Sequence, residues 1–308
     1  MGPQNETRVM PYGPAAIAEA ARLVLAGEPV AVPTETVYGL AADATNAEAV
    51  ARIYAAKGRP SFNPLIVHVA DLGEAERIGL FSGTARALAA AHWPGPLTLV
   101  VPLAPDSAIA PAVTAGLATI ALRCPAHPAM RDLLAATRRP LAAPSANASG
   151  GISPTTAGHV LASLGGRIAL IVDGGPTERG LESTIVKVEG DKVTLLRPGP
   201  LAIEADAAAD GPVEAPGMLA SHYAPAKPLR LDAARAEPDE WLIGFGPVEG
   251  DDTLSASGDL EEAAARLFAA LHRADAEARP RIAVAPIPDR GLGAAINDRL
   301  RRAAAPRG

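Results

Sequence analysis

Two cations one residue apart, Lys57 and Arg59, are the side chains of this 308-residue chain whose types and spacing most clearly suggest chemistry. They end a helical pattern and precede Ser61 and Asn63, which are short polar donors in front of a predicted strand at 65–69. Lysine supplies a point charge and arginine a planar fork, and both suit phosphate groups. The two cations could equally complement the negative C-terminal end of their helix. The segment alone leaves these interpretations about even.

The predicted strand at 118–124 adds a third cation. Because successive side chains in a strand point to opposite faces, Thr119 and Arg123 share one face, while Cys124 falls on the other, apolar face. A hydroxyl and a guanidinium on a central strand suit the floor of a cleft for a carboxylate or phosphate. The alternative is an outer sheet face exposed to solvent. Cys124 is interpreted as a packing residue.

Other polar residues are less informative on their own. His68 shares a strand face with Ile66 and fits an ordinary core histidine as well as a site. His222 and Tyr223 lie in a proline-rich stretch, where they could close over a ligand or form an ordinary turn. The chain has no G-x-x-x-x-G-K-[ST] loop, no G-x-G-x-x-G after its first strand and no G-x-S-x-G elbow. If ATP binds, dispersed side chains must hold it.

Alternating helix and strand patterns position these residues in an α/β domain with a mixed sheet. Asn46 is a predicted N-cap of a helix that runs to Lys57 and ends at Gly58. Another helix is expected at 17–25. Strands are expected at 30–32, 65–69, 97–103, 119–124 and 168–172, with a hairpin formed by 182–188 and 192–197.

A smaller domain follows. Residues 202–227 lack periodicity and contain three prolines, so we expect a linker. Beyond it, strands are predicted at 229–231, 241–245 and 282–286, a helix begins at Asp259, and another follows Gly293. The expected domains are 1–205, a linker at 206–227, and a small three-layered α/β domain at 228–308.

Composition narrows the function classes. Acidic residues number 34 and basic residues 28, a net charge of −6, which disfavours nucleic acid as the main ligand. A single cysteine excludes an internal disulfide and a cysteine-based metal cluster. With no stretch long enough to span a bilayer and no apolar N-terminal segment, we expect a soluble cytoplasmic protein with no membrane partner.

Several motifs, in order, resemble the YrdC-like family and its long, two-domain threonylcarbamoyl-AMP synthases. They are Pro33-Thr-Glu-Thr-Val-Tyr-Gly-Leu40, Lys57-x-Arg59 running into Asn63-Pro-Leu-Ile-Val-His68, Trp93-Pro-Gly-Pro-Leu-Thr98, Pro144-Ser-Ala-Asn147, Glu182-Ser-Thr184, Arg197-Pro-Gly199 and Ser221-His-Tyr-Ala-Pro225. The resemblance implies a YrdC-like twisted mixed sheet with a large open cavity. It also implies a Rossmann-like C-terminal domain, joined by a linker that crosses the cavity.

The resemblance also implies which side chains form the site. Around L-threonine it places Thr36, His68, Arg123, Ala143 and Ser183. Around ATP it places Arg59, Asn63, Thr119, Ser145, Ser153, Arg197 and Tyr223. The Lys-x-Arg and Ser-x-Asn pairs, Lys57 with Arg59 and Ser145 with Asn147, are the expected catalytic residues.

The implied reaction joins L-threonine, bicarbonate or CO2, and ATP into threonylcarbamoyl-AMP and pyrophosphate, for threonylcarbamoyl-adenosine modification of tRNA. Mg²⁺ is expected to be held mainly by ATP phosphates and water, with no protein metal site. A tRNA threonylcarbamoyl transferase is the expected transient downstream partner, and tRNA itself is not the primary ligand. The alternatives are an RNA-binding module of the same fold and a carbamoyltransferase. Few aromatic residues and a single cysteine count against them.

Overall fold

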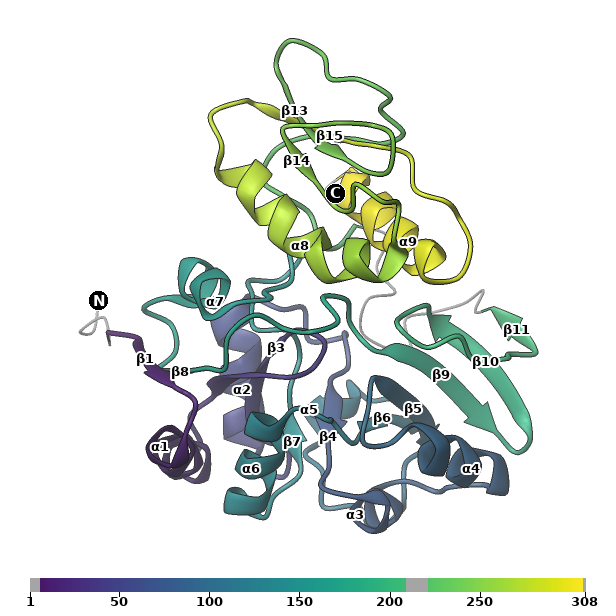
Figure 1. Ribbon diagram of the computed structural model, residues 1–308. Coiled ribbons are helices and arrows are strands. Elements are labelled where there is room, and N and C mark those ends of the chain that lie inside the picture. The colour runs from purple at the N-terminus through teal and green to yellow at the C-terminus, as the bar shows by residue number, and fades with distance from the viewer. Residues whose placement is uncertain (1–5, 209–220, 307–308) are drawn as a thin grey trace.

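A computed structural model describes residues 6–208 and 221–306, and these residues form two α/β units, each built on its own sheet (Figure 1). In the described part of the chain, eleven strands make the large mixed sheet of the first unit. In spatial order they are β1 (Arg8–Pro11), β8 (Leu170–Asp173), β2 (Val30–Pro33), β3 (Tyr38–Asp43), β7 (Leu141–Ala142), β4 (Ile66–His68), β6 (Thr119–Arg123), β5 (Leu97–Pro102), β9 (Thr184–Glu189), β10 (Lys192–Arg197) and β11 (Ala207–Ala208).

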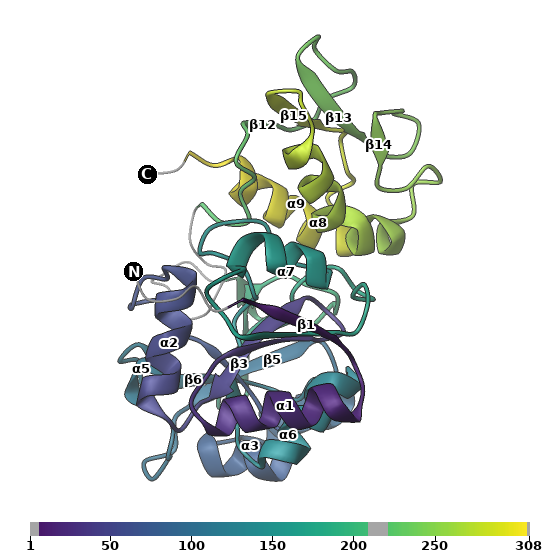
Figure 2. The ribbon, with the colours of Figure 1, turned by 90° about the vertical axis from the view of Figure 1, so that its left-hand side faces the viewer.

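Helices cover this sheet unevenly. The helices of the first unit are α1 (Pro14–Leu25), α2 (Ala47–Lys57), α3 (Leu72–Ile78), α4 (Gly83–His92), α5 (Pro111–Thr114), α6 (Pro128–Thr137) and α7 (Ala157–Leu164). Figure 2 shows α1 beside α6, and both pack with β2 and β8 in one apolar cluster. The larger cluster joins α2, α3, α4 and α7 to the other face of β2 and to one face of β4, β5 and β6.

The remaining face of the β4–β6–β5–β9 region carries only a small apolar cluster. It consists of Ile66, Val100, Ala121, Ile185 and Leu196. The polar side chains of the same strands point to this face. For β6, the alternation of side chains predicted this arrangement. It is here that the sheet leaves room for a site.

The predicted local signals around Lys57 are confirmed. The Asn46 side chain accepts hydrogen bonds from the backbone N–H groups of Glu48 and Ala49, and Gly58 ends α2 in the left-handed conformation (φ 59°). The antiparallel β9–β10 hairpin is also confirmed. The sequence patterns missed β3, whose six residues are all buried and therefore show no alternation.

The second unit has two layers, so the prediction of three layers is wrong. Its parallel strands lie in the order β12 (Leu229–Arg230), β15 (Arg281–Val284), β13 (Glu240–Gly244) and β14 (Asp252–Thr253). Helices α8 (Leu260–Ala276) and α9 (Leu292–Ala304) both pack on the sheet face that turns toward the first unit (Figure 1). The other face of this second sheet carries a small apolar cluster of Ala233, Leu242, Ala283 and Val248. Loops cover it in place of helices.

The apolar core of the second unit continues into the first. Val37, Ile152 and Leu181 of the first unit belong to the same buried cluster as residues of α8 and α9, and so does Tyr223. The stretch 209–220 of the predicted linker lies outside the described residues. The first sheet extends to β11, just past the predicted boundary at 205, and the domain boundaries stay a prediction.

Candidate active site

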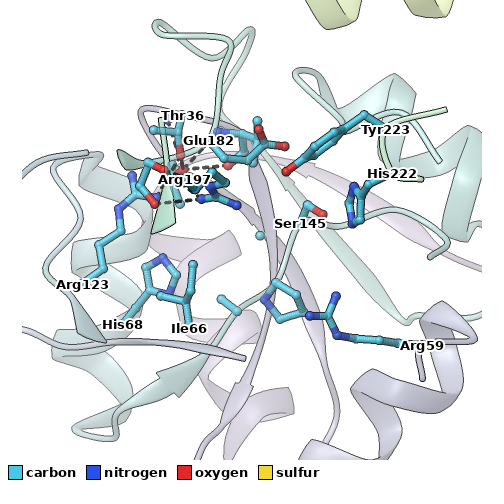
Figure 3. Close-up of a pocket in the computed structure, with 16 residues that line it drawn as sticks. Thr36, Arg59, Ile66, His68, Arg123, Ser145, Glu182, Arg197, His222 and Tyr223 are labelled. Carbon is cyan, nitrogen blue, oxygen red and sulfur yellow. Dashed lines mark hydrogen bonds between the residues drawn. The ribbon is translucent and has the colours of Figure 1, made fainter. Parts of the chain in front are cut away.

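A cavity lies on the less covered face of the large sheet, beneath the second unit (Figure 3). Its walls come from the segment after β2, from β3, from the loop after α2, from β4 and β6, from the loop after β7, from the segment just before β9, from the end of β10, and from residues 222–223. The lining residues are Thr34, Thr36, Val37, Gly39, Arg59, Ile66, His68, Arg123, Ala143, Pro144, Ser145, Glu182, Ser183, Arg197, His222 and Tyr223.

Most residues predicted for the site line this one cavity. They are Thr36, Arg59, His68, Arg123, Ala143, Ser145, Ser183, Arg197 and Tyr223. The predicted residues outside its lining are Lys57, Asn63, Thr119, Asn147 and Ser153. Three of the four predicted cations therefore converge on a common space, although their segments are far apart in the sequence.

Arg123 is held by three protein groups at the cavity wall. Its Nη2 is paired with Glu35 Oε1 at 2.6 Å, its Nη1 donates to Thr36 Oγ1 at 3.0 Å, and its Nε donates to the Gly95 carbonyl at 3.3 Å. Burial raises the pKa of Glu35, but the charge and hydrogen bond of Arg123, together with backbone hydrogen bonds, outweigh this and leave that pKa lowered. An arginine has five N–H donors, so two remain for a ligand. The ion pair with Glu35 therefore holds the Arg123 guanidinium in place without engaging all of its N–H donors.

Arg197 is held against the start of β9. Its Nη2 donates to the Ser183 carbonyl at 2.9 Å and to Ser183 Oγ at 3.1 Å, and that hydroxyl also bonds to Thr98 Oγ1 at 2.8 Å. A Cβ at Gly199 would lie 2.4 Å from the backbone nitrogen of Thr184. The glycine of the Arg-Pro-Gly motif is therefore needed for the close approach that brings Arg197 and Ser183 together.

Lys57 lies behind the cavity wall. Its buried ammonium donates to the carbonyls of Ser145, at 2.6 Å, and Asn147. The Asn147 amide in turn donates to the carbonyls of Ala148 and Gly151. Burial, and then the nearby charge of Arg59, lowers the pKa of Lys57. In this structure the Lys-x-Arg and Ser-x-Asn pairs meet, with Lys57 shaping the loop that presents Ser145.

Arg59 reaches the cavity from the end of α2 (Figure 3). It also donates to the carbonyls of Asn63, at 3.2 Å, and Pro64, at 2.9 Å, which folds its own loop around it. Burial lowers the pKa of Arg59 to about 10, so it stays charged at neutral pH. The buried amide of Asn63 has no hydrogen-bond partner within residues 6–208 and 221–306. Such a group is available to a ligand.

Two neutral histidines face the cavity. Burial, and then the charge of Arg123, lowers the pKa of His68 to about 3. Burial lowers the pKa of His222 to about 3 as well. At neutral pH both rings are therefore uncharged and can orient a ligand without adding to its electrostatic binding.

Tyr223 forms the roof. Its backbone has φ 63°, the left-handed region that a bulky residue rarely adopts. The turn is held by the neighbouring Ala224, whose N–H donates to the Gly150 carbonyl at 2.8 Å. The Tyr223 ring packs 4.1 Å from the His222 ring, and both line the cavity. The backbone fits the turn interpretation of these two residues, and closure over a ligand stays a prediction.

Ser153 and Thr119 occupy other positions. Ser153 is buried and donates to Glu182 Oε1. Thr119 shares the face of Arg123 but lies four residues earlier on β6, about 13 Å away at the ordinary rise of a strand. Their proposed ATP contacts stay predictions.

Glu182 and Glu35 were not predicted as site residues. Both sit inside quoted motifs beside predicted residues, which was the only signal for them. Glu182 lines the cavity and pairs with Arg299 of α9 at 2.9 Å, a partner that no sequence pattern indicated. Burial raises the pKa of Glu182, but the charges of Arg299 and Arg197 outweigh it and the pKa is lowered.

The cavity offers no protein ligand set for a metal ion. Among the described residues, no group of three or more histidine, cysteine, aspartate or glutamate side chains is placed to bind one. Of the described residues that line the cavity, Glu182 alone has a carboxylate, and Ser153 and Arg299 engage its two oxygens. The arrangement instead suits anions, which three arginines with neutral donors between them can hold in a water-poor space.

Comparisons with known proteins match both units. A family model of the Sua5, YciO and YrdC proteins, described as "Telomere recombination", matches residues 22–199. A model described as "Threonylcarbamoyl-AMP synthase, C-terminal domain" matches residues 181–305.

Named relatives are similar along nearly the whole chain. A threonylcarbamoyl-AMP synthase of Bacillus subtilis is 43% identical over 321 residues, covering 94% of this chain and 92% of the relative. One from Pyrococcus abyssi is 39% identical over 317 residues, covering 92% of each. The crystal structure of P. abyssi Sua5 complexed with L-threonine superposes with a TM-score of 0.89 at 35% identity, over 97% of this chain and 98% of that one.

Proposed function

This chain belongs to the Sua5/YciO/YrdC family and its threonylcarbamoyl-AMP synthase branch, and we propose that its cavity is where the family reaction takes place. As a member of this family it is an enzyme that makes threonylcarbamoyl-AMP for the modification of tRNA. The proposed substrates are L-threonine, bicarbonate or CO2, and ATP, and pyrophosphate is the second product.

One observation carries the proposal: Arg59, Arg123 and Arg197 line a single cavity. The reaction brings an amino-acid carboxylate and a triphosphate together, and each needs cationic donors. Without the arginines, the two anions would repel each other at the distance that bond formation requires.

Threonine is proposed to lie at the Arg123 wall. Its carboxylate would take the two remaining N–H donors of Arg123, with Thr36, His68 and Ser183 supplying neutral contacts and Ala143 a backbone contact. The threonine L-amine, once neutral, attacks CO2 to form a carbamate, with loss of a proton. From bicarbonate, the same carbamate forms with loss of water. A neutral His68 suits this wall because it adds no charge to compete with Arg123 for the carboxylate.

ATP is proposed to lie between Arg59, Ser145, Arg197 and Tyr223, with Asn63, Thr119 and Ser153 as further contacts. A carbamate oxygen attacks the α-phosphorus, and the bond from that phosphorus to the bridging oxygen breaks, releasing pyrophosphate. The protein supplies no nucleophile. Its part is to hold the reactants in line and to offset the charge of the leaving group.

Mg²⁺ is proposed to enter with ATP, bound by phosphate oxygens and water. Both oxygens of the Glu182 carboxylate already accept protein hydrogen bonds, and the proposed phosphate and water ligands do not depend on this group. The role of this chain's residues is then to bind the ion's phosphate ligands and not the ion itself.

Water exclusion follows from the roof. The carbamate and the mixed anhydride are both hydrolytically fragile, and the ring of Tyr223 over the cavity limits access of bulk water. The RNA-binding and carbamoyltransferase alternatives receive no comparable support, because the relatives that match along both units are threonylcarbamoyl-AMP synthases.

The product is proposed to pass to a tRNA threonylcarbamoyl transferase in the cytoplasm. Within the described parts of the chain, none of the helices has the length and apolar character needed to cross a bilayer. Direct contact with tRNA is not part of the proposed role.

Pyrophosphate release from ATP tests the function. We expect release to require L-threonine and bicarbonate together, and to fall to background when either is left out. Mass spectrometry should then detect threonylcarbamoyl-AMP in an amount equal to the pyrophosphate. Release independent of threonine would contradict the proposal.

A further inference from the structure

Arg299, in the second unit, has the largest fully buried side chain of the described residues. It lies on α9, and no part of its side chain is exposed. Arginine is almost never fully buried unless it is paired, because removing its charge from water is costly. The partners of Arg299 therefore indicate what this cation does.

Those partners lie on both sides of the contact between the two units. Arg299 Nε donates to Glu182 Oε2, 2.9 Å away on the cavity wall, and Nη1 donates to the neighbouring Asp298 at 2.7 Å. The guanidinium carbon lies 5.3 Å from the centre of the Tyr223 ring, within the range of a cation–π contact. One side chain of the second unit thus touches both a wall and the roof of the cavity.

Glu182 connects Arg299 to the residues of the site. The other carboxylate oxygen accepts from Ser153, and the next residue, Ser183, holds Arg197. A shift of Glu182 would therefore move the segment that presents Ser183 and Arg197. Burial lowers the pKa of Arg197 most, Tyr223 acts in the opposite direction, and the charge of Arg299 lowers the pKa further, so the two arginines lie within electrostatic reach.

The roof depends on the second unit in the same way. Tyr223 is held in a left-handed backbone conformation that is costly for a bulky residue and persists only where its surroundings impose it. Its ring packs between Arg299 on α9 and Phe268 on α8, with ring centres 5.7 Å apart in the second contact. Both of these contacts come from the second unit.

We propose that Arg299 is a positioning residue for the reaction, which aligns the Glu182 wall and the Tyr223 roof only when the second unit is docked. This inference rests on the proposed function of the cavity and assigns the second unit a part in it. Arg299 acts through its two neighbours and does not touch the reacting atoms. The cavity is then complete only in the two-unit protein.

The test uses the full chain with Arg299→Met, which removes the charge but keeps much of the apolar stem. We expect kcat for threonine-dependent pyrophosphate release to fall roughly 10- to 100-fold, as small misplacements of catalytic groups do. The Kd of ATP, measured by calorimetry, should stay near the wild-type value. Arg299→Lys keeps the charge and should recover part of kcat. Arg301→Met, an exposed position on the same helix, is the matched control and should behave as wild type.

A double variant separates positioning from general damage. If Arg299 works through Glu182, the Glu182→Gln/Arg299→Met protein should be no slower than the slower single variant, because residues that act as a unit are not additive. Losses that multiply would overturn the inference. So would a normal kcat in Arg299→Met, or a loss confined to ATP affinity, which would indicate direct phosphate contact. If Arg299→Met does not fold, judged by its thermal transition, Arg299→Lys carries the same test, and a wild-type kcat there overturns the inference.

Measurements on the wild-type protein distinguish a failure of the proposed function from a failure of the proposed role of Arg299. Threonine-dependent release in the wild type with an unaffected Arg299→Met variant would leave the proposed function standing and remove the role of Arg299. Absence of threonine-dependent release in the wild type would remove the function itself.

Discussion

Two buried arginine–glutamate pairs stand on the walls of the cavity, and they differ in what surrounds them. Arg123 and Glu35 belong to one unit, with side chains 5% and 7% exposed, and backbone N–H groups of Ala126 and His127 also donate to Glu35. Arg299 and Glu182 join two units, with side chains 0% and 8% exposed. The Nη2 of Arg299 finds no acceptor in the described residues, whereas each terminal nitrogen of Arg123 does.

This difference implies that the wall held by Arg123 and Glu35 is fixed, whereas the wall held by Arg299 and Glu182 can adjust. A pair in which every guanidinium nitrogen and both carboxylate oxygens are engaged inside one unit, as in Arg123 and Glu35, does not come apart unless that unit unfolds. A pair between units can separate when the units separate, and its unsatisfied N–H group lowers the cost of doing so. The threonine wall is therefore expected to be permanent, and the wall and roof next to ATP to depend on docking.

The largest effect should come from breaking the fixed pair. Arg123→Ala removes the proposed carboxylate donor and leaves Glu35 buried without its cation, which costs about 3–5 kcal/mol of unfolding free energy. We expect kcat/KM for threonine to fall on the order of 10³-fold, equivalent to about 4 kcal/mol, with a much smaller change in ATP affinity. Pyrophosphate kinetics and calorimetric unfolding measure the two effects.

The control for that variant is Arg86→Ala, which breaks an exposed pair with Glu76. Such pairs contribute at most about 1 kcal/mol, so activity and stability should barely change. An Arg123→Ala protein that lost ATP affinity as strongly as threonine use would contradict the division of the cavity into two walls.

The next effect should come from the roof. Tyr223→Ala removes the ring that stacks on Arg299, and we expect product formation to fall roughly 10- to 100-fold together with weaker ATP binding. Threonine binding, measured directly, should be close to wild type because the Arg123 wall is untouched. Tyr223→Phe keeps the ring and should keep most of the activity. Equal losses in both variants would assign the effect to the hydroxyl.

A smaller effect is expected from acid at the contact between units. The rings of His159 on α7 and His272 on α8 stack 3.9 Å apart across that contact. Burial, and then the charges of His272 and Arg273, lowers the pKa of His159 to about 4 from its ordinary 6.5. Between these values the unfolded chain takes up a proton that the folded one does not. Stability should therefore fall as pH is lowered from about 6.5 toward 4.

The fixed wall responds in a different range. The pKa of Glu35 is lowered, so the stability it contributes is present above its ordinary pKa of 4.5 and is lost only as pH falls through the lower, folded value. Scanning calorimetry between pH 7 and pH 4 should show the loss predicted for His159, and His159→Gln should reduce it only in part, because the lowered pKa values of His68 and His222 cause a loss of the same sign. A slope unchanged in that variant would assign the acid sensitivity to other groups.

The smallest effects should come from the helix caps of the two units. Asn46→Ala on α2 and Asp259→Ala on α8 each remove a side-chain acceptor from a helix start. Each should cost about 1 kcal/mol, or roughly 2–4 °C in Tm, with kcat unchanged while the protein is folded. A fall in kcat from Asp259→Ala alone would indicate that docking is even more sensitive than the Arg299 contacts suggest.

Local signals made much of the first unit predictable from sequence. The Asn46 cap and the Gly58 stop correctly placed Arg59 just past the end of a helix, and the alternation of β6 correctly placed Arg123 on the face opposite the packed Cys124. Thr119 obeyed the same alternation but lay too far along the strand to line the cavity. The alternation of side chains along a strand predicts which face a residue occupies, but it does not predict whether that position along the strand lies at the cavity.

Long-range pairings were not predictable in this way. Glu182 and Arg299 are separated by 117 positions, and nothing local to either one indicates the other. An isolated arginine on an amphipathic helix is expected to face solvent, as Arg301 does. The layer count of the second unit failed for a related reason, since periodicity predicts two helices without saying which face of the sheet each one covers.

The shared apolar cluster has a consequence for how such chains can be divided. Val37, Ile152 and Leu181 are shielded from water by α8 and α9. A fragment ending at residue 205 would expose these side chains as an apolar patch around the mouth of its cavity. Such a fragment would be prone to self-association. The second unit therefore also protects this apolar surface of the first unit from water.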